Sequence, residues 1–377
     1  MVIGVPRETH RHEHRVGLTP LAISRLIKHG NTVLVERNAG EAAHFKDRHF
    51  QEVGAQVVYS DDEVYKRADV VCRVGVISTE ELDLLKRGSV VCAFHHLAIQ
   101  PREKVERLME LETTLIGYEL IRDENGDMPV LVPFSEMAGQ MVIPLAAYYL
   151  QTEEGGRGIL MGNVPGVPPP TVLILGAGRV GHAAARNALL SGAHVVVLDN
   201  DLTKLRAINR EFSGQVVTAV SNDERLTRYT AIADVVIGAI LIPGERAPSL
   251  ITEEMVKAMR TGSVIIDVSI DQGGCSETSR PTSIDNPTYI VHNVVHYCVP
   301  NMTANIARTA SRALADAALP YVMEIADRGM EEALRRDPGL GDGVFLYKGQ
   351  MVNSGAGEVF NIPVIPLGQL TGEGELS

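Results

Sequence analysis

The segment TVLILGAGRVG, residues 171–181, constrains the fold more than any other stretch of this chain. An apolar run ends at Gly176, Gly178 and Gly181, which have the spacing G-x-G-x-x-G, and a helical pattern follows at once. Glycines at this spacing permit a tight turn, close approach of the backbone to a pyrophosphate, and close packing of helix on strand, while the helix N-terminus receives the phosphates. The segment therefore predicts a dinucleotide-binding βαβ unit of the Rossmann type.

A second apolar run, HVVVLD, ends at Asp199, about 20 residues beyond the glycines, as the complete pattern requires. A carboxylate there accepts hydrogen bonds from ribose hydroxyls and repels a 2′-phosphate, so it favours NAD over NADP as the cofactor. The alternative interpretation is a glycine-rich turn in an ordinary α/β fold with an acidic strand end. That alternative leaves the combined pattern of strand, turn, helix and aspartate unexplained.

The rest of the chain alternates short apolar runs with helical patterns. A length of 377 residues indicates two domains. The alternation predicts parallel sheets with crossover helices, once over residues 1–130 and again after the glycine- and proline-rich stretch 155–170. A long helical pattern covers residues 301–327, and the glycine-rich residues after it are expected to be irregular. The predicted fold class is α/β, with two Rossmann-like domains, each a mostly parallel sheet flanked by helices.

Composition excludes several classes of protein. A formal charge of -12 argues against a nucleic-acid binder, which needs a basic face. We expect a cytoplasmic protein without membrane contact, because the chain begins without a signal segment and no apolar run reaches the ~20 residues that span a bilayer. The four cysteines form no CxxC pair, and the three alternating histidines at 10, 12 and 14 lack a matching distal cluster, so no metal site is predicted.

The first candidate for chemistry is the stretch PRETHRHEHRVGLTP, which holds Arg7, Arg11 and Arg15. It lies between the first predicted strand and the first predicted helix, at the sheet edge where ligands bind in such folds. An arginine there can hold a carboxylate through two hydrogen bonds. For any single arginine, a solvated basic turn is the alternative.

The second candidate is AFHHLA, in which His95 and His96 end an apolar strand. Adjacent strand residues point to opposite faces, so at most one of the two faces a given cleft. A histidine in a cleft is suited to general acid or base catalysis near neutral pH. A buried structural imidazole is the alternative.

The third candidate is VIIDVSIDQGG, in which Asp267 and Asp271 bracket a strand end of the cofactor unit. One of these carboxylates can face the nicotinamide and polarise a water or an ammonium group. The alternative is that it caps the loop that follows.

The stretch DVVCRVGVIS, residues 69–78, places an arginine and a glycine at the end of another apolar run. If the strand continued through this stretch, alternation would put residues 71, 73 and 75 on one face. Arg73 would then be a lone cation on that face, beside a position without a side chain at Gly75.

Together these segments resemble the alanine dehydrogenase and transhydrogenase family over essentially the whole chain. The stretches that carry the resemblance are GVPRETHRHEHRVGLTP, VPFSEMAGQM, GGRGILMGNVPGV, LGAGRVG, DVSIDQGGCSETSRPT and HYCVPNMTA. The resemblance implies reversible, NAD-dependent oxidative deamination of L-alanine to pyruvate and ammonium. It also implies that Arg15 binds the substrate carboxylate, that His96 is the acid/base, and that Asp271 assists the water and amine steps.

The resemblance further implies a substrate domain of residues 1–130 plus 305–377 and an NAD-binding domain of residues 131–304. The active site would lie in the cleft between them, and the assembly would be a homohexamer. Besides the glycines of the turn, the family's cofactor contacts fall on Ser135, Arg179, Val180, Asp199, Lys204, Ser221, Ile240, Leu241, Val268, Ser269, Ile270, Asp271, Arg280, Val299, Pro300, Asn301 and Met302.

One position departs from the family's pattern. Family members read approximately KVKEP where this chain has RVGVI, and their second lysine, which contacts the substrate, falls on Gly75. Loss of such a donor typically costs ~3–4 kcal/mol of transition-state stabilisation. Two interpretations remain. In the first, Arg73 replaces the lysine as a substrate-binding residue, against the alternative that it only keeps its own place. In the second, the vacancy at Gly75 indicates another amino or oxo acid substrate, or a catalytically silent NAD-binding protein.

Overall fold

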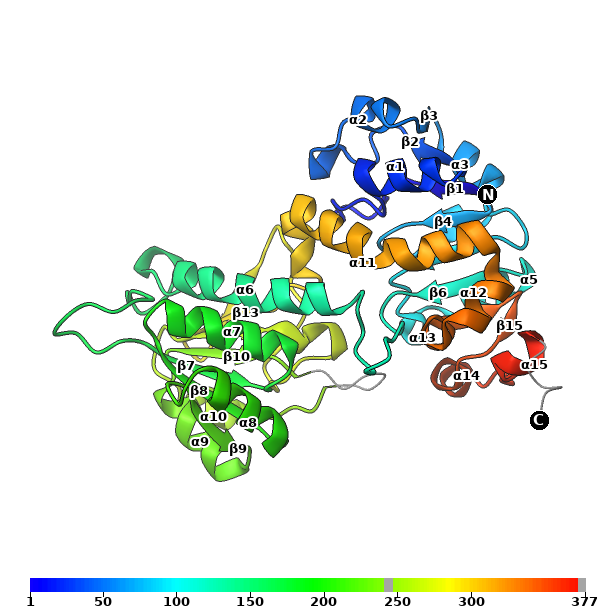
Figure 1. The fold of residues 1–377 in the computed structure, drawn as a ribbon. Helices are drawn as coiled ribbons and strands as arrows, with labels where there is room; N and C mark the ends of the chain where they lie inside the picture. The colour runs from blue at the N-terminus through cyan, green and yellow to red at the C-terminus, as the bar shows by residue number, and fades with distance from the viewer. Residues whose placement is uncertain (241–246, 372–377) are drawn as a thin grey trace. The chain divides into compact units, whose positions relative to one another are not determined.

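The structure, a computed structural model, describes residues 1–240 and 247–371. The chain forms two compact units, one of residues 1–134 with 304–377 and the other of residues 135–303 (Figure 1). Each unit contains one mostly parallel sheet with helices packed against it, so the predicted fold class is confirmed. The chain therefore leaves the first unit after residue 134 and returns to it at residue 304.

The sheet of the first unit has the strand order β15-β14-β6-β5-β4-β1-β2-β3. Its parallel strands are β1 (Val2–Val5), β2 (Thr32–Glu36), β3 (Gln56–Val58), β4 (Val70–Cys72), β5 (Val90–Ala93) and β6 (Thr114–Gly117). Its helices are α1 (Pro20–Lys28), α2 (Asp47–Glu52), α3 (Asp61–Arg67), α4 (Thr79–Leu82), α5 (Arg102–Glu110), α11 (Ala307–Arg328), α12 (Met330–Arg336), α13 (Pro338–Asp342), α14 (Ser354–Phe360) and α15 (Leu367–Thr371), with 3-10 turns η1 (Glu41–Ala43) and η2 (Leu97–Ile99).

Two expectations about the first unit are wrong. The residues after 327 are not irregular, because β14 (Val344–Tyr347) and β15 (Gln350–Met351) extend the sheet in antiparallel pairing from β6. The stretch 69–78 is not one strand, because β4 ends at Cys72. Positions 71, 73 and 75 therefore do not share a strand face.

The sheet of the second unit has the order β12-β13-β11-β10-β7-β8-β9. Its parallel strands are β7 (Thr171–Leu175), β8 (His194–Asp199), β9 (Val217–Val220), β10 (Val235–Gly238), β11 (Val264–Asp267) and β13 (Val294–Tyr297), and β12 (Thr288–Val291) is antiparallel. The helical elements are α6 (Val132–Tyr149), which begins just before this unit, α7 (Arg179–Leu190), α8 (Leu202–Glu211), α9 (Asp223–Ile232) and α10 (Glu253–Lys257), with 3-10 turns η3 (Thr152–Glu154), η4 (Val268–Gln272) and η5 (Met302–Ile306).

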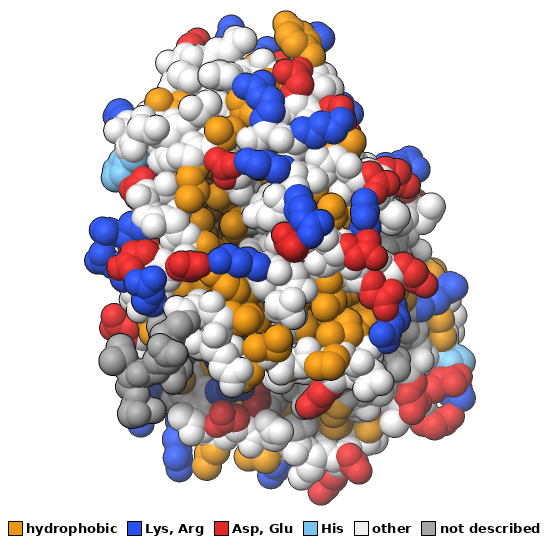
Figure 2. All heavy atoms as spheres, turned by 90° about the vertical axis from the view of Figure 1, so that its right-hand side faces the viewer, with side chains coloured by type: hydrophobic (Ala, Val, Ile, Leu, Met, Phe, Trp, Pro, Cys, Tyr) orange, Lys and Arg blue, Asp and Glu red, His pale blue; other side chains and the backbone are white. Residues whose placement is uncertain are grey.

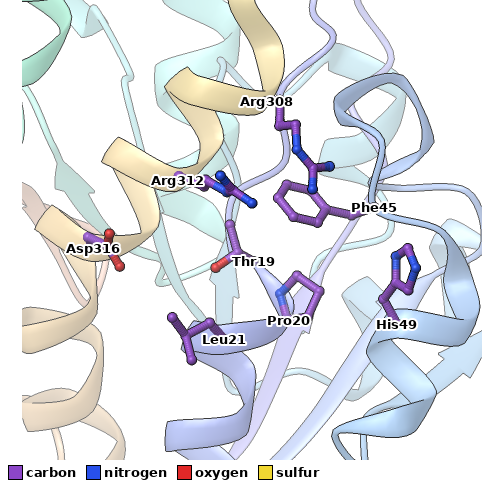
Figure 3. A pocket seen from close by; sticks show the side chains of 8 residues that line it. All are labelled: Thr19, Pro20, Leu21, Phe45, His49, Arg308, Arg312 and Asp316. Carbon is purple, nitrogen blue, oxygen red and sulfur yellow. The ribbon is translucent and has the colours of Figure 1, made fainter.

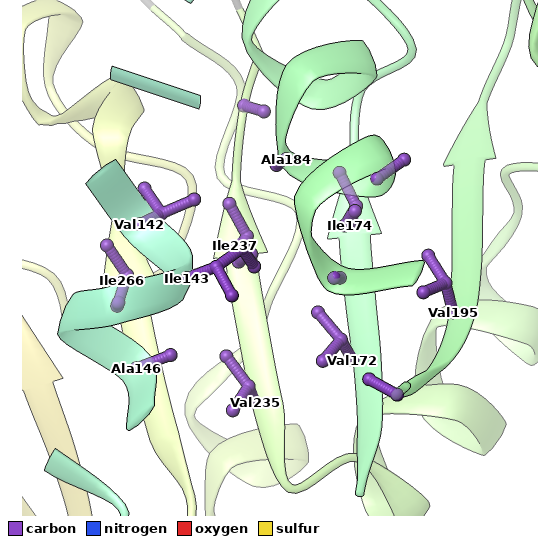
Figure 4. Packing of buried hydrophobic residues seen from close by; sticks show 14 of the residues in the cluster. Val142, Ile143, Ala146, Val172, Ile174, Ala184, Val195, Val235, Ile237 and Ile266 are labelled. Atoms are coloured by element: carbon purple, nitrogen blue, oxygen red, sulfur yellow. The ribbon is translucent and has the colours of Figure 1, made fainter. Parts of the chain in front are cut away.

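Strand alternation builds two apolar layers in the second unit. Val172 and Ile174 of β7 contribute to a buried cluster that includes residues of α6 and α7 (Figure 4). Leu173 and Leu175 of the same strand belong to a second cluster with residues of α9 and α10. The parallel sheet is thus buried on both faces, which explains why its strands are continuous apolar runs rather than alternating ones.

Charges are mixed on the surface. Figure 2 shows Lys and Arg side chains interspersed with Asp and Glu on one face, with apolar patches between them. No helix in the described parts of the chain combines the length and apolar character that crossing a bilayer requires.

Candidate active site

The glycine turn of the second unit has the geometry that its sequence predicts. Gly176 has φ 104°, and a Cβ there would clash with the carbonyl oxygen of Ala239. A Cβ on Gly181 would clash with the carbonyl oxygen of Gly176, so the turn and the helix packing require both glycines. A Cβ on Gly178 meets nothing within 4 Å. The middle glycine therefore faces open space at the N-terminus of α7, where a phosphate can approach the backbone.

Asp199 ends β8 beside this turn. Its Oδ2 accepts the N–H of Ala177 over 2.6 Å, and its Oδ1 accepts the N–H of Asp201 over 2.7 Å. The carbonyl of Asp199 accepts the N–H of Ser221 over 2.9 Å, and Lys204 lies in the first turn of α8. The structure thus brings Asp199, Ser221 and the glycine turn together at the carboxyl edge of the sheet.

The loops after β10, β11 and β13 are joined by hydrogen bonds between predicted cofactor residues. The N–H of Ile240 donates to Oγ of Ser269 over 2.9 Å, and the N–H of Asn301 donates to Oδ1 of Asp271 over 3.2 Å. Val268 and Ile270 lie with these residues in or beside η4, Val299 and Pro300 follow β13, and Met302 begins η5. Leu241 lies outside the described residues.

Four further predicted residues lie on helices or in the loop after β11. Arg179 and Val180 open α7, and α6, which carries Ser135, packs so closely on α7 that a Cβ on Gly139 would clash with the Val180 carbonyl oxygen. The Arg280 guanidinium lies over the Tyr289 ring, 4.4 Å from its centroid. All these cofactor assignments stay predictions.

The two aspartates of the third candidate differ in environment. Asp267 is 1% exposed, and its Oδ2 accepts the N–H of Cys275 over 2.8 Å and the hydroxyl of Ser279 over 2.6 Å. Burial raises the pKa of the Asp267 carboxyl. Asp271 is exposed on η4. Asp267 therefore holds the loop that follows it, and Asp271 is the aspartate that solvent can reach.

Arg15 of the first unit is buried rather than solvated. Its Nε donates to Oε1 of Glu13 over 2.7 Å and its Nη2 to Oε2 over 2.5 Å, while the guanidinium lies 5.3 Å from the Phe134 ring centroid. The solvated-turn alternative is therefore wrong for Arg15. It fits Arg7, whose side chain is exposed and lies 3.9 Å from Glu36.

A chain of rings connects Arg15 to the predicted acid/base. The Phe134 ring meets the Phe94 ring edge to face at 5.1 Å, and Phe94 stacks with His96 at 6.4 Å. His96 is exposed and has φ 43°, and its N–H donates to Oε1 of Glu119 over 2.7 Å. The structure therefore gathers Arg15 and His96 at one end of the first sheet.

His95 is buried where His96 is exposed, but both lie beyond the end of β5 at Ala93, so strand alternation is not the cause. It is 2% exposed, its Nε2 lies 3.1 Å from the carbonyl oxygen of Val91, and its ring meets Phe345 edge to face. Burial lowers the pKa of His95 to about 4. His95 is thus the structural imidazole of the pair, and the burial of Glu119 raises the pKa of that carboxyl beneath His96.

Arg73 is enclosed by a polar network. It is 1% exposed, and its Nη2 contacts Oε2 of Glu8 while its Nη1 contacts Oε2 of Glu81, each at 2.9 Å. Nη1 also donates to the Tyr65 hydroxyl over 2.7 Å. Three partners from different elements hold this guanidinium, and this favours the interpretation that Arg73 keeps its own structural place.

Gly75 lies beside the same network. Its N–H donates weakly to Oε2 of Glu8 over 3.4 Å, and the N–H of Val74 donates to Oε1 over 2.6 Å. A Cβ at position 75 would meet only the Glu8 carboxylate, at 3.4 Å. The vacancy is therefore compatible with a side chain.

Sequence reasoning missed Glu8, Glu81 and Glu119. Glu81 had a local signal, because Ser78 and Glu81 form a capping box in which the N–H of Ser78 donates to Oε2 of Glu81 over 2.6 Å. Glu8 and Glu119 bind groups far away in sequence, so no spacing rule identifies them.

A cavity of about 410 Å³ elsewhere on the first unit contains none of the predicted residues. Figure 3 shows its lining from the start of α1, the segment around α2, and α11. Arg308 in its wall donates to the carbonyl oxygens of Ala43 and His44 and lies over the Phe45 ring. Within the described residues, no group of three His, Cys, Asp or Glu side chains is placed to hold a metal ion.

Comparison with known proteins supports the family resemblance over almost the whole chain. The alanine dehydrogenase/PNT N-terminal domain matches residues 4–138, and the alanine dehydrogenase/PNT C-terminal domain matches residues 142–354. Alanine dehydrogenase of Mycobacterium tuberculosis is 40% identical over 363 residues, which cover 96% of this chain and 98% of that protein. Alanine dehydrogenase 2 of Staphylococcus aureus is 42% identical over 96% of this chain and 97% of its own. A solved L-alanine dehydrogenase superposes with a TM-score of 0.92 at 41% identity, over 96% of this chain and 99% of that one.

Proposed function

This chain belongs to the alanine dehydrogenase/PNT family, and on that premise we propose that it catalyses the reversible, NAD-dependent oxidative deamination of L-alanine. The reaction converts L-alanine, water and NAD⁺ to pyruvate, ammonium, NADH and a proton. The observation that carries the proposal is the full-length similarity to alanine dehydrogenases at about 40% identity, which includes both units.

The glycine turn supports NAD as the cofactor. Gly178 leaves room for a phosphate at the start of α7, and the Asp199 carboxylate lies beside the turn, where ribose hydroxyls can donate to it. A bound NAD would supply the acceptor for the hydride from the substrate Cα. The residues expected to hold it include Asp199, Ser221 and the loop of Val268 to Asp271.

The first unit supplies residues for the substrate. In the proposed enzyme, Arg15 binds the substrate carboxylate, and Glu13 and Phe134 fix the direction of its guanidinium. His96 exchanges protons at the amine and carbonyl positions, and its exposure leaves the imidazole accessible. Asp271 of the second unit assists addition of water to the iminium and departure of ammonium.

Gly75 supports a second candidate function. The family's lysine is absent at that position, and the nearby Arg73 is bound to Glu8 and Glu81. A pocket without that lysine suits an NAD-dependent dehydrogenase of another amino or oxo acid, or a catalytically silent homologue that only binds NAD.

One assay separates these functions. Purified protein is incubated with NAD and a panel of L-amino acids at alkaline pH, and the formation of NADH is followed by its absorbance. Turnover on alanine supports the first proposal, and turnover on a different amino acid alone supports the second. NAD binding by calorimetry without any turnover would indicate the silent homologue.

We further propose that the chain acts in the cytoplasm as a homohexamer, as the family resemblance implies. Light scattering of the purified protein tests the oligomer, and a mass of one or two chains would contradict it.

A further inference from the structure

We propose that Asp267 is a positioning residue for the cofactor loop: its buried carboxylate holds residues 268–280 in the shape that binds NAD. The inference rests on the proposed function, because it concerns the same reaction. Asp267 itself would touch neither the substrate nor the cofactor, and its role would be exerted through Asp271 and Arg280.

The first support is the pair of hydrogen bonds that Asp267 accepts. Oδ2 binds the N–H of Cys275, eight residues on, over 2.8 Å, and the hydroxyl of Ser279, twelve residues on, over 2.6 Å. The short distance to Ser279 is typical of a hydroxyl that donates to an ionised carboxylate. One oxygen therefore closes the whole segment from the end of β11 to the residue before Arg280.

The second support is the packing around the carboxylate. A Cβ on Gly238 of the neighbouring strand would clash with Sγ of Cys275 and lie 2.8 Å from Oδ1 of Asp267. A Cβ on Gly274 would lie 2.9 Å from Oδ2, and Gly274 also has φ 84°. Two glycines thus make room for this carboxylate, and its Oδ1 has no hydrogen-bond partner among the described residues. A buried carboxylate oxygen without a hydrogen bond lowers stability, which is consistent with a role of Asp267 in shaping the site.

The third support is the set of contacts made by the loop that Asp267 holds. Ser269 accepts from the N–H of Ile240, Asp271 accepts from the N–H of Asn301, and the N–H of Arg280 donates to the Tyr289 hydroxyl over 2.8 Å. The loop after β11 is therefore bonded to the loops after β10 and β13 and to β12. A shift of this loop would move several predicted cofactor residues together.

The test uses two variants that weaken the hydrogen bond between Asp267 and Ser279, and a third, conservative variant that keeps it. Ser279→Ala removes one donor and leaves the carboxylate, whereas Asp267→Asn removes the charge and keeps the size of the side chain. We expect each to weaken NAD binding by about tenfold, as measured by calorimetry, since hydrogen bonds to a charged group are the stronger ones. Ser279→Thr keeps the hydroxyl and is expected to restore the affinity to within about threefold of the unchanged protein.

A matched control comes from the opposite, amino-terminal ends of the strands of the same sheet. Asp234 is also buried, at 4% exposure, and its Oδ2 accepts the N–H of Thr171 over 2.9 Å before β10 begins. Asp234→Asn should lower the melting temperature as Asp267→Asn does, but leave the NAD dissociation constant unchanged. A purely structural role of Asp267 would make the two variants alike in affinity as well as in stability.

The outcomes are distinct for the two proposals. If the unchanged protein binds NAD but does not oxidise alanine, the proposed function fails and the affinity series still tests the loop. If alanine is oxidised and Ser279→Ala binds NAD as tightly as the unchanged protein, the positioning role is overturned while the proposed function stands. If Asp267→Asn does not fold, Ser279→Ala against Ser279→Thr decides.

Discussion

Arg73 and Glu8 form a buried ion pair, with Nη2 of the arginine 2.9 Å from Oε2 of the glutamate. The pair connects the loop after β1 to the loop after β4. Glu81 and Tyr65 complete the enclosure from α4 and α3. The guanidinium therefore bridges three segments beneath Gly75, which explains why a cation is buried at this place.

Arg73→Met should destabilise the protein strongly. It removes the cation of the network and leaves Glu8 and Glu81 buried without a counter-charge. Such a change typically lowers the free energy of unfolding by ~3–5 kcal/mol. Urea denaturation followed by circular dichroism measures the free energy of unfolding. The control is Arg87→Met, because the pair between Arg87 and Glu112 is exposed and should contribute little. Equal losses for the two variants would contradict the structural role assigned to Arg73.

Gly75→Lys should raise alanine turnover if the missing lysine limits catalysis. A Cβ there meets only Glu8 Oε2 at 3.4 Å, and Gly75 does not have positive φ, so the variant should fold. A restored donor is expected to increase kcat/KM for L-alanine by about a hundredfold. Gly75→Met supplies length without charge and should leave kcat/KM for L-alanine unchanged. If turnover of another amino acid falls in Gly75→Lys while alanine stays unused, the vacancy is part of that substrate's pocket.

The sequence predicted the second unit better than the first for a physical reason. The cofactor unit is defined largely by local requirements, since Gly176 has a positive φ in the turn and Gly181 lies against the Gly176 carbonyl where the helix packs on its own strand. By contrast, β14 joins the first sheet by pairing with β6, more than 200 residues earlier in sequence, and β15 then pairs with β14. Local sequence patterns carry no information about such a distant partner.

The predicted substrate residues of the first unit show the same limit of local sequence patterns. Arg15 stood out because it lies between a predicted strand and a predicted helix, and His96 because it ends a predicted strand. The residues that support them did not stand out, because Phe134 contacts Arg15 and Glu119 accepts the His96 N–H only after the chain has folded. Arg73 was misplaced on a strand because VVCRVGV is apolar enough to continue one, whereas Glu8 binds the N–H groups of Val74 and Gly75 where the strand has ended.

His95 should make stability depend on pH. Its pKa is about 4 in the folded protein because of burial and about 6.5 when unfolded, so between these values the unfolded chain binds a proton that the folded one does not. The free energy of unfolding should therefore fall as pH falls from about 6.5 to 4, by about 3 kcal/mol. His95→Leu removes this term, and denaturation at pH 7 and pH 4.5 compares the two proteins. An unchanged difference between the two pH values in His95→Leu would show that other groups are responsible.

His96→Gln should impair chemistry without impairing cofactor binding. If His96 is the acid/base, kcat is expected to fall by about 10²- to 10⁴-fold, while NAD affinity, which depends on the second unit, stays unchanged. His194→Gln at the exposed start of β8 is the control, and its steady-state rates should equal those of the unchanged protein. A kcat for His96→Gln within a few-fold of normal would remove His96 from the proposed mechanism.

Asp199→Asn tests cofactor choice at the turn. Both carboxylate oxygens of Asp199 accept backbone N–H groups, from Ala177 and Asp201, and an amide can accept at only one of these places. NAD affinity should therefore fall by about tenfold, because the turn loses one of its hydrogen bonds as well as the charge that ribose hydroxyls bind. NADP affinity should fall less, since removing the carboxylate charge also removes its repulsion of the 2′-phosphate. Calorimetry with each dinucleotide gives the ratio of the two dissociation constants, and Asp199→Glu, which retains the charge, should preserve the preference for NAD. If the ratio is the same in Asp199→Asn as in the unchanged protein, Asp199 does not select the cofactor, and its hydrogen bonds serve only the shape of the turn.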